Sequence, residues 1–524
     1  MTADPSTAPA QQIAAGYAFS GPALELGTVV VDGVVDPSAR VRIPLATVNR
    51  HGLVAGATGT GKTKSLQMIA EQLSAAGVPV LMADVKGDLS GLSRPGAAGD
   101  KTTQRAADTG DAWTATAYPV EFLSLGTGGV GVPVRATITS FGPILLSKVL
   151  GLNATQESTL RLIFHFADQS GLALLDLKDL RAVIQYLTSD EGKPELKALG
   201  AVSTTTAGVI LRALVNLEAE GGDTFFGEPE LEPEDLMRRD AQGRGVITLL
   251  ELGNQAARPV LFSTFLMWVL ADLFTSLPEV GDVEKPNLVF VFDEAHLLFT
   301  DASKAFLEQV EQTVKLIRSK GVGVFFCTQL PTDVPNDVLS QLGARIQHAL
   351  RAFTPDDEKA LRKTVRTYPK TTAYDLGEAL TSLGIGEAVV TVLSETGAPT
   401  PVAWTRMRAP RSLMDTIGPD AISAAAKASP LQAEYGQTID RESAYERLSA
   451  RVAPPEPVDL PPSVPQWDGP VASGERAEAG TEPGMMEKVI GSTAFKSAMR
   501  SAGTVIGREI TRSIFGTGRR RRRR

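Results

Sequence analysis

The residues from Gly56 to Thr63 have the types and the spacing that bind a nucleotide's phosphate chain. They fit G-x-x-x-x-G-K-[ST] at every fixed position. Glycines let the backbone fold around phosphates, so that its N–H groups and the following helix N-terminus point at the anion. Lys62 would neutralise the β- and γ-phosphates, and the Thr63 hydroxyl would hold Mg²⁺. The whole loop is therefore assigned to nucleotide binding: Gly56, Ala57, Thr58, Gly59, Thr60, Gly61, Lys62 and Thr63.

A pair of acids follows a second apolar run, Leu288–Phe292. At the carboxyl end of a buried strand, Asp293 would hold Mg²⁺ through water, and Glu294 would polarise the attacking water. An acid pair at a strand end is a moderate signal alone, but together with the loop it is a strong one. Attack of water on a γ-phosphate requires positioning and charge neutralisation more than covalent chemistry. The two motifs together predict ATP hydrolysis that uses Mg²⁺.

Three further side chains are candidates for the same reaction. Gln329 follows the apolar run Val322–Thr328 and would contact the γ-phosphate or the attacking water; otherwise it is a turn residue before Pro331. Arg345 and Arg351 flank the next strand-like segment. One of them would act as an arginine finger, worth roughly 10³–10⁵ in rate, or both are surface residues. A finger from a neighbouring subunit requires an oligomer. The chain has no Asn-Lys-x-Asp motif, which argues against a GTPase.

Two more acids, Asp84 and Asp88, follow the apolar run Val78–Ala83. A strand, the phosphate loop, a helix and a second strand make a βαβ unit, in which charges just past a strand's end lie on the ligand-binding rim. These carboxylates either touch the metal and its waters or are solvated loop charges. The sequence leaves both interpretations open.

At least six buried runs alternate with helical patterns, which is typical of a doubly wound, mostly parallel α/β sheet. Between the two motifs, apolar residues recur at helical spacing with no strand pattern, so an all-helical insertion is expected. Residues 94–118, rich in Gly, Ala and Thr, predict a flexible excursion. The expected division is a disordered N-terminus (1–17), an α/β ATPase domain (18–143 and 240–410), the helical insertion (144–239), a helical extension (411–450), a Pro/Gly-rich linker (451–484) and a basic amphipathic helix with a poly-Arg tail (485–524).

Composition excludes several classes of protein. The single cysteine, Cys327, rules out an internal disulfide framework and a Cys-rich zinc site, and the four histidines lack metal-ligand spacing. The start of the sequence lacks the pattern of a signal peptide, and the longest apolar run, 260–270, is too short to cross a bilayer, so a cytoplasmic protein is expected. Without the six arginines at 519–524 the formal charge of −8 becomes −14. Nucleic acid would therefore be bound only at a local patch, a pore or the tail.

The motifs together resemble the HerA–FtsK superfamily of RecA-like P-loop ATPases, and within it the bacterial HerA-like helicase family. The resemblance lies in Leu53–Thr63, Phe290–His296, Cys327–Gln329 and, more weakly, Ala344–Ile346, and it covers about residues 20–410. It implies a RecA-like fold, ATP hydrolysis, a homo-oligomer that is often a hexameric ring, and DNA in the pore. The long insertion between the two motifs is a departure from the family pattern.

Two functional hypotheses follow. The first is a Mg²⁺- and ATP-dependent motor that moves or remodels DNA, where the DNA half rests on the family resemblance. The second is a nucleotide-gated switch or scaffold acting on protein or membrane partners without DNA translocation, which the acidic body favours. The poly-Arg tail would bind nucleic acid or acidic lipid, or it only aids solubility.

Overall fold

The structure is a computed structural model that describes residues 8–84, 87–198, 203–219, 221–251, 259–281, 283–300, 302 and 304–452. The predicted linker at 451–484 lies almost wholly outside these residues, and the predicted basic helix and poly-Arg tail lie entirely outside them. Contacts between backbone atoms divide the chain into two units, 1–448 and 449–524. Every element described below belongs to the first unit, apart from the last four residues of α17.

The described strands form one mixed sheet with a long parallel section. Its order is β2-β1-β12-β11-β10-β3-β9-β8-β4-β7-β5-β6. All pairs from β10 to β6 are parallel, and the pairs from β2 to β10 are antiparallel. The strands are β1 (Ala23–Val31), β2 (Val34–Pro44), β3 (Gly52–Ala55), β4 (Val80–Asp84), β5 (Val120–Leu125), β6 (Val132–Val134), β7 (Ile247–Glu251), β8 (Leu288–Phe292), β9 (Val322–Thr328), β10 (Ala344–Gln347), β11 (Glu387–Thr391) and β12 (Ala403–Met407).

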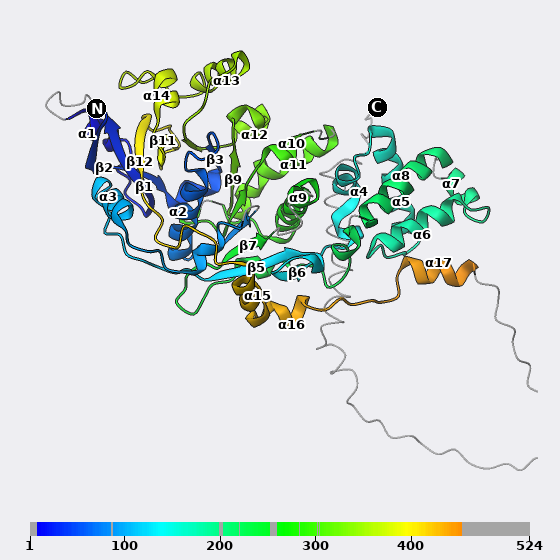
Figure 1. Ribbon diagram of the computed structural model, residues 1–524. Coiled ribbons are helices and arrows are strands. Elements are labelled where there is room, and N and C mark those ends of the chain that lie inside the picture. Colours follow the sequence, from blue (N-terminus) through cyan, green and yellow to red (C-terminus); the bar gives the residue numbers. More distant parts are fainter. Residues whose placement is uncertain are drawn as a thin grey trace, which may run out of the picture. The chain divides into compact units, whose positions relative to one another are not determined.

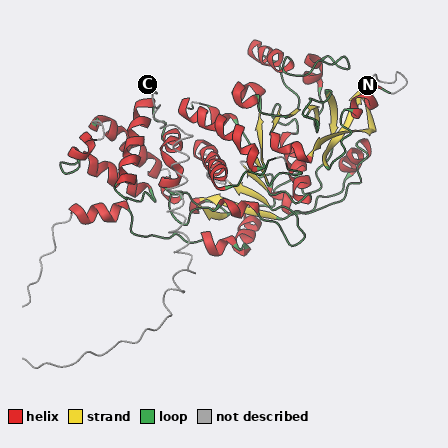
Figure 2. Ribbon diagram, turned by 180° about the vertical axis from the view of Figure 1, so that it is seen from behind, coloured by secondary structure: helices red, strands yellow, loops and turns green. Residues whose placement is uncertain are grey.

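Side chains alternate between two hydrophobic cores, one on each face of the sheet, because successive residues of a strand point to opposite sides. In β8, Val289 and Val291 belong to one core, and Phe290 and Phe292 belong to the other. The phosphate-loop helix α2 (Lys62–Ala75) packs on the first face, and α9 (Pro259–Ser276) and α11 (Lys304–Ile317) pack on the second. Figure 2 shows red helices on both sides of the yellow sheet. The predicted RecA-like α/β fold is confirmed.

Within the described ranges, no helix is both long enough and apolar enough to span a membrane.

Besides α2, α9 and α11, the α-helices are α1 (Pro9–Ala15), α3 (Asp100–Asp108), α4 (Ile138–Val149), α5 (Ala154–Gln169), α6 (Leu177–Thr188), α7 (Lys193–Ala198), α8 (Thr204–Ala219), α10 (His296–Phe299), α12 (Asn336–Leu339), α13 (Pro355–Val365), α14 (Leu376–Ser382), α15 (Pro419–Ala428), α16 (Leu431–Tyr435) and α17 (Ala444–Val452).

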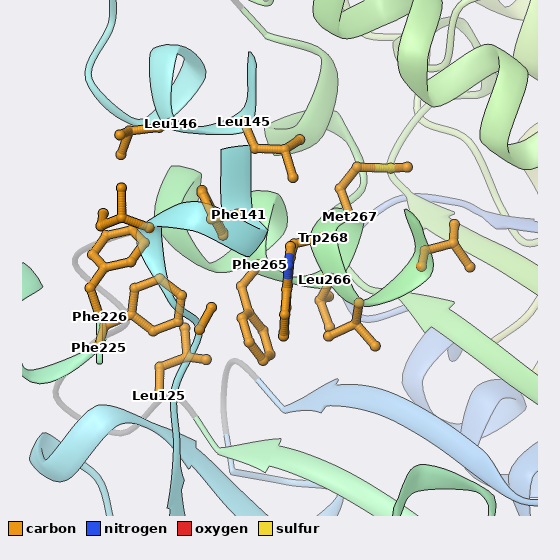
Figure 3. Close-up of a cluster of buried hydrophobic side chains, with 14 of the residues drawn as sticks. Leu125, Phe141, Leu145, Leu146, Phe225, Phe226, Phe265, Leu266, Met267 and Trp268 are labelled. Carbon is orange, nitrogen blue, oxygen red and sulfur yellow. The ribbon is translucent and has the colours of Figure 1, made fainter. Parts of the chain in front are cut away.

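The predicted all-helical insertion is present as α4 to α8, which lie together in Figure 1. The apolar faces of these helices pack on one another and also join the core of the sheet. Figure 3 shows where α4 meets α9, with Phe141, Phe225 and Phe265 among the side chains that fill the junction. The ring of Phe225 makes edge-to-face contacts with Phe141, Phe226 and Phe265, with centroids 4.5–5.9 Å apart. The insertion is therefore packed continuously with the ATPase core.

Replacing Phe225 by alanine is expected to lower the free energy of unfolding by about 3–4 kcal/mol. The side chain is 1% exposed, and removing it would leave a cavity between the insertion and α9. Urea denaturation followed by circular dichroism measures the change. Phe353→Ala is the matched control because that ring is 84% exposed. Equal stabilities for the two variants would contradict the idea of a shared core.

Two segments with polar composition are ordered by contacts with distant residues. In α1, within the segment whose composition favoured disorder, Gln11 donates to Asp36 and Ser38 of β2. In α3, within the expected flexible excursion, Arg105 donates to the carbonyls of Ile385 and Gly386. Local composition gave no sign of either helix, because the partners lie far away in the sequence.

Residues 411–448 form a strap that runs from the phosphate-loop helix to the insertion. At its start, the carboxylate of Glu71 on α2 accepts bonds from the backbone N–H groups of Arg411 and Ser412 at 2.9–3.0 Å. Then α15 packs on β5 and α16 packs on the edge strand β6. At the far end, Asp179 on α6 accepts bonds from the Ser443 hydroxyl and from the Tyr445 amide. Figure 1 traces this path in orange from α15 to α17.

Candidate functional site

The phosphate-binding loop leaves the carboxyl end of β3 and enters α2, and two of its glycines are required by close approaches. A Cβ on Gly56 would lie 2.6 Å from the Cβ of His348, and one on Gly61 would lie 3.2 Å from the backbone nitrogen of Gly386. Both glycines also have positive φ angles, 151° and 118°. The first turn of α2 has N–H groups without intrahelical acceptors, so this loop and helix end form an anion-binding site.

The loop is fixed to the two strands that flank β3. The amide of Gly56 donates to the carbonyl of Thr328 at 3.3 Å, and the amide of Ala57 donates to the carbonyl of Ala349 at 2.8 Å. Thr328 ends β9, and Ala349 lies just past β10. The carboxyl ends of three adjacent parallel strands thus meet at this loop.

Lys62 lies over the loop. Its Nζ donates to the carbonyl oxygens of Gly56 and Ala57 at 2.7 and 3.2 Å. Both acceptors are neutral, whereas a phosphate oxygen carries charge and forms a stronger bond with an ammonium group. Lys62 is therefore in reach of any phosphate chain that the loop holds.

His348 packs against Gly56 of the loop and bonds α2, a supporting role that the sequence did not predict. Its Nδ1 lies 2.8 Å from the carbonyl of Glu387, and its Nε2 lies 3.0 Å from the hydroxyl of Ser65 on α2. Nδ1 must therefore carry the hydrogen, and Nε2 accepts from the serine. Burial, with a smaller effect from the charge of Lys62, lowers the pKa of His348 to about 4, so the ring is neutral. Its spacing in the sequence gave no signal, since its partners are 39 and 283 residues away.

The predicted acids follow β8 in a tight turn. The amide of Glu294 donates to Oδ1 of Asp293 at 2.9 Å, and the amide of Ala295 donates to the carbonyl of Cys327 on β9 at 2.8 Å. Glu294 has a φ of 47°, which is uncommon for a residue other than glycine. A residue held in such a conformation costs of order 1–3 kcal/mol and persists only where its surroundings impose it. The turn therefore fixes the direction of the Glu294 side chain.

Cys327 lies on β9, the strand between the phosphate-loop strand β3 and the acid-pair strand β8. Burial raises its pKa well above the ordinary value, the charge of Asp293 and a hydrogen bond to it raise the pKa further, and the charge of Lys62 lowers it. Cys327 pairs with Val54 of β3, and its neighbour Phe326 pairs with Phe292 of β8. The phosphate loop after β3 and the acid turn after β8 therefore flank the end of β9.

The Glu294 side chain remains open to the site. The side chain is 24% exposed, and Oε2 lies 3.5 Å from Nδ1 of His296. A group with this exposure can contact a water molecule at the mouth of the loop. The geometry is compatible with the general-base role that the sequence predicts for Glu294.

Gln329 is exposed at the end of β9, next to the strand that carries the phosphate loop. Asp333 braces its two neighbours, because one carboxylate oxygen accepts from the Thr328 hydroxyl at 2.6 Å and from the Leu330 amide at 2.9 Å. Gln329 thus stands on a fixed turn beside Thr328, whose carbonyl binds the loop. The predicted contact of Gln329 with the γ-phosphate is compatible with this position.

The two arginine candidates occupy different places. Arg345 lies within β10, and its guanidinium donates to the carbonyl of Thr367 at 3.2 Å, beyond α13. Arg351 is exposed and lies two residues past Ala349, which binds the loop. Of the two, Arg351 is nearer in sequence to Ala349, the residue that binds the loop.

Asp84 and Asp88 differ in how deeply their side chains are buried. Asp84 is 1% exposed, and its Oδ2 accepts from the Leu89 amide at 2.8 Å, which closes the loop after β4. Burial, and then the charge of Asp84, raises the pKa of the neighbouring Glu251 to about 8. Asp88 is half-buried. The sequence gave no reason to single out Glu251, which pairs with Asp84 across two parallel strands.

Oxygen donors suited to Mg²⁺ are present at the loop. Thr63 on α2 and Asp293 after β8 supply a hydroxyl and a carboxylate, which are hard ligands of the kind that Mg²⁺ prefers alongside phosphate oxygens. Among the described residues, no group of three His, Cys, Asp or Glu side chains is arranged to hold a metal by itself. This donor set fits a metal that arrives with a nucleotide.

His51 supports β3 from the opposite end. Its Nδ1 accepts from the amide of Val324 on β9 at 3.0 Å, so its Nε2 must donate to the carbonyl of Val314 on α11, 2.8 Å away. Burial, with a smaller effect from the charge of Arg318, lowers the pKa of His51 to about 4. Protonation at Nδ1 would place two N–H groups against each other.

Acid is expected to destabilise the protein through His51. Because its pKa in the folded chain lies below the ordinary 6.5, this contribution is complete above pH 6.5 and is lost progressively as the pH falls toward 4. Between pH 7.5 and pH 5 the loss is about 2 kcal/mol. His51→Asn, which tolerates the φ of 62°, should remove this part of the pH dependence. Urea denaturation at both pH values measures it, with the exposed His165→Asn as the control. An unchanged pH dependence in His51→Asn would contradict the assignment.

Comparison with protein families gives one match across most of the chain. The family described as helicase HerA-like C-terminal matches residues 31–523. A sequence relative is the DNA double-strand break repair helicase HerA of Saccharolobus solfataricus, 19% identical over 370 residues. The alignment covers 70% of this chain and 66% of that protein, so it spans slightly less than two thirds of the relative.

Two solved structures align with most of the chain. The unbound form of the bacterial conjugative coupling protein TrwB aligns with a TM-score of 0.49 at 16% identity, over 77% of this chain and 94% of that chain. VirB4 of Thermoanaerobacter pseudethanolicus aligns with a TM-score of 0.46 at 14% identity, over 74% of this chain and 97% of that chain.

Proposed function

The chain belongs to the helicase HerA-like C-terminal family, and from this premise we propose that it hydrolyses ATP with Mg²⁺ and couples the hydrolysis to movement along DNA or remodelling of DNA. One observation supports the hydrolysis most directly. Lys62, the acid pair at Asp293 and Glu294, and Gln329 stand at the carboxyl ends of β3, β8 and β9, which are adjacent in the sheet. A phosphate chain on the loop would meet all of them at its γ end.

In the proposed reaction, a water oxygen attacks the γ-phosphorus and the bond from that phosphorus to the ADP oxygen breaks. Glu294 accepts the proton of the water, and Gln329 orients the water or a γ-oxygen. Lys62 balances the charge on the β- and γ-oxygens, where the transition state places it. Mg²⁺ would be held by Thr63 directly and by Asp293 through water, and when bound it neutralises the phosphate oxygens.

The DNA half of the proposal rests on the relative from Saccharolobus solfataricus, which is named as a DNA repair helicase. With a charge of −14 outside the terminal arginines, the chain offers DNA few general contacts. We therefore place the DNA in the pore of a homo-oligomeric ring, such as a hexamer. In this ring, Arg345 or Arg351 would reach the γ-phosphate bound to the neighbouring subunit. Native mass spectrometry with a slowly hydrolysed ATP analogue tests the ring. A monomeric mass under these conditions would contradict both the DNA pore and the arginine finger from a neighbouring subunit.

Stimulation of ATP turnover by DNA tests the coupling. We expect turnover to rise when DNA is added to the full chain, and to rise similarly in a variant whose residues 519–524 are all serine. Phosphate release measures both. Stimulation that disappears with the arginines would reduce the DNA contact to anion binding by the tail.

A second candidate function is a nucleotide-gated switch acting on protein or membrane partners, with slow hydrolysis and no translocation. The acidic composition favours it. Turnover that does not change with DNA, in a protein that binds ATP tightly, would favour this function over the motor.

A further inference from the structure

Two exposed apolar residues lie in segments whose backbones are hydrogen-bonded to the phosphate loop. Among the large apolar residues that the structure describes, Phe353 (84% exposed) and Ile385 (75%) are the most exposed. Phe353 lies between β10 and α13, and Ile385 lies between α14 and β11. Neither has a part in the reaction proposed above, although exposing such large apolar side chains brings no stability.

Both side chains are tied closely to the loop through their own backbones. Phe353 lies four residues past Ala349, the carbonyl of which accepts the Ala57 amide. Ile385 precedes Gly386, whose amide donates to the carbonyl of Thr60 at 3.0 Å. These two segments are therefore fixed to the rim of the phosphate loop.

The two segments are also fixed to each other. The amide of Leu350 donates to the carbonyl of Leu380 at 2.8 Å, and Leu350, Leu380 and Leu383 belong to one small core. Figure 1 shows α13 and α14 side by side near β11. Both residues project from loops that rest on this core.

Hydrogen bonds hold each exposed residue in place. The carboxylate of Asp357 accepts from the amides of Phe353 and Thr354 at 3.2 and 3.0 Å. The guanidinium of Arg105 donates to the carbonyl of Ile385 at 3.1 Å. Loops braced in this way present their side chains at fixed positions, so less entropy is lost when a flat ligand binds.

The direction of a bound nucleotide follows from the sheet order. Glu294 and Gln329 follow β8 and β9, on one side of β3, so the γ-phosphate lies on that side. The α-phosphate and the nucleoside must then extend to the other side of β3, where β10 and β11 lie. This is the side that carries Phe353 and Ile385.

We propose that Phe353 and Ile385 form the platform on which the base of the bound nucleotide stacks, an inference that rests on the proposed ATP site. An aromatic face and a branched aliphatic chain offer a flat heteroaromatic ring apolar contact without reading its edge. Stacking of a base on an aromatic side chain is worth about 1–3 kcal/mol. These residues contribute to the affinity for the nucleoside and nothing to the affinity for phosphates.

Affinities for ATP and for inorganic tripolyphosphate, measured by calorimetry with Mg²⁺, separate the two contributions. Phe353→Ala is expected to weaken ATP binding about tenfold and to leave tripolyphosphate binding within about twofold, which corresponds to the lower part of the stacking range. Ile385→Ser should act in the same direction. Val34→Ala, an exposed apolar residue on β2, is the control and should change neither affinity.

A tryptophan at position 353 gives a direct readout. The emission of Phe353→Trp, after subtraction of the signal from the four native tryptophans, should be quenched by ATP and not by tripolyphosphate. Equal affinities for ATP in Phe353→Ala and the unaltered protein would overturn the platform and leave the ATP site intact. Equal weakening of both ligands would also overturn it, as would a change in oligomer mass without a change in the ratio of affinities. Failure of the unaltered protein to bind either ligand would reject the proposed function itself.

Discussion

Replacing Glu294 by glutamine is expected to reduce ATP turnover by about 10²–10⁴-fold while ATP still binds with nearly unchanged affinity. Glutamine keeps the size and hydrogen-bonding length of the side chain but cannot accept the proton of the attacking water. The backbone φ of 47° at this position should strain glutamine no more than glutamate, because the two side chains are identical at Cβ. Steady-state phosphate release gives the turnover, and calorimetry gives the affinity.

Glu308→Gln is the matched control for this variant, because its side chain is 58% exposed on α11. Turnover in this control should equal that of the unaltered protein. If Glu294→Gln hydrolyses ATP at the normal rate, Glu294 is not the general base. Asp293, the other carboxylate of the turn, would then be the candidate base.

Replacing Lys62 by alanine is expected to weaken ATP binding about 10- to 100-fold, and to lower turnover at saturation by a further factor of about 10²–10³. The affinity falls because a charge-assisted bond to the β- and γ-phosphates is lost. The turnover falls because that charge is most needed in the transition state. Arginine at this position should not restore activity, since its planar group is larger than the ammonium that fits beside Gly56 and Ala57.

The control for the lysine variant is Lys101→Ala, an exposed lysine on α3. Thermal unfolding of Lys62→Ala without nucleotide should match that of the unaltered protein, because Lys62 is only partly buried and water can replace its two bonds to the loop carbonyls. With ATP present, only the unaltered protein and the control should gain stability. A gain of equal size in Lys62→Ala would show that the lysine does not bind the phosphates.

The parts of the site that could be predicted are those encoded by adjacent residues. The phosphate loop is a single local motif, and Asp293 stands directly after an apolar strand, so spacing alone assigned them. The alternation of buried runs and helical patterns predicted the parallel section of the sheet in the same way. Every one of these signals lies within a window of about 20 residues.

The parts that could not be predicted depend on contacts across the chain. His51 and His348 appeared as isolated histidines, yet His51 binds residues more than 260 positions away. Strand β6 has only three residues, one of them Pro133, too few for a periodic signal. Polar α3 is held by Arg105 against Ile385 and Gly386, which its own composition cannot reveal. Tertiary contacts decide such elements more than local propensity does.

The strap sets where the chain can be cut. A protein that ends at Pro410 would retain every residue assigned to chemistry. It would also leave the carboxylate of Glu71, which is 2% exposed, without the amides of Arg411 and Ser412. It would uncover β6 along the edge that α16 protects, which invites pairing with other chains. The shortest soluble fragment that can be expected to bind nucleotide therefore extends through Leu448, far beyond its last sequence motif.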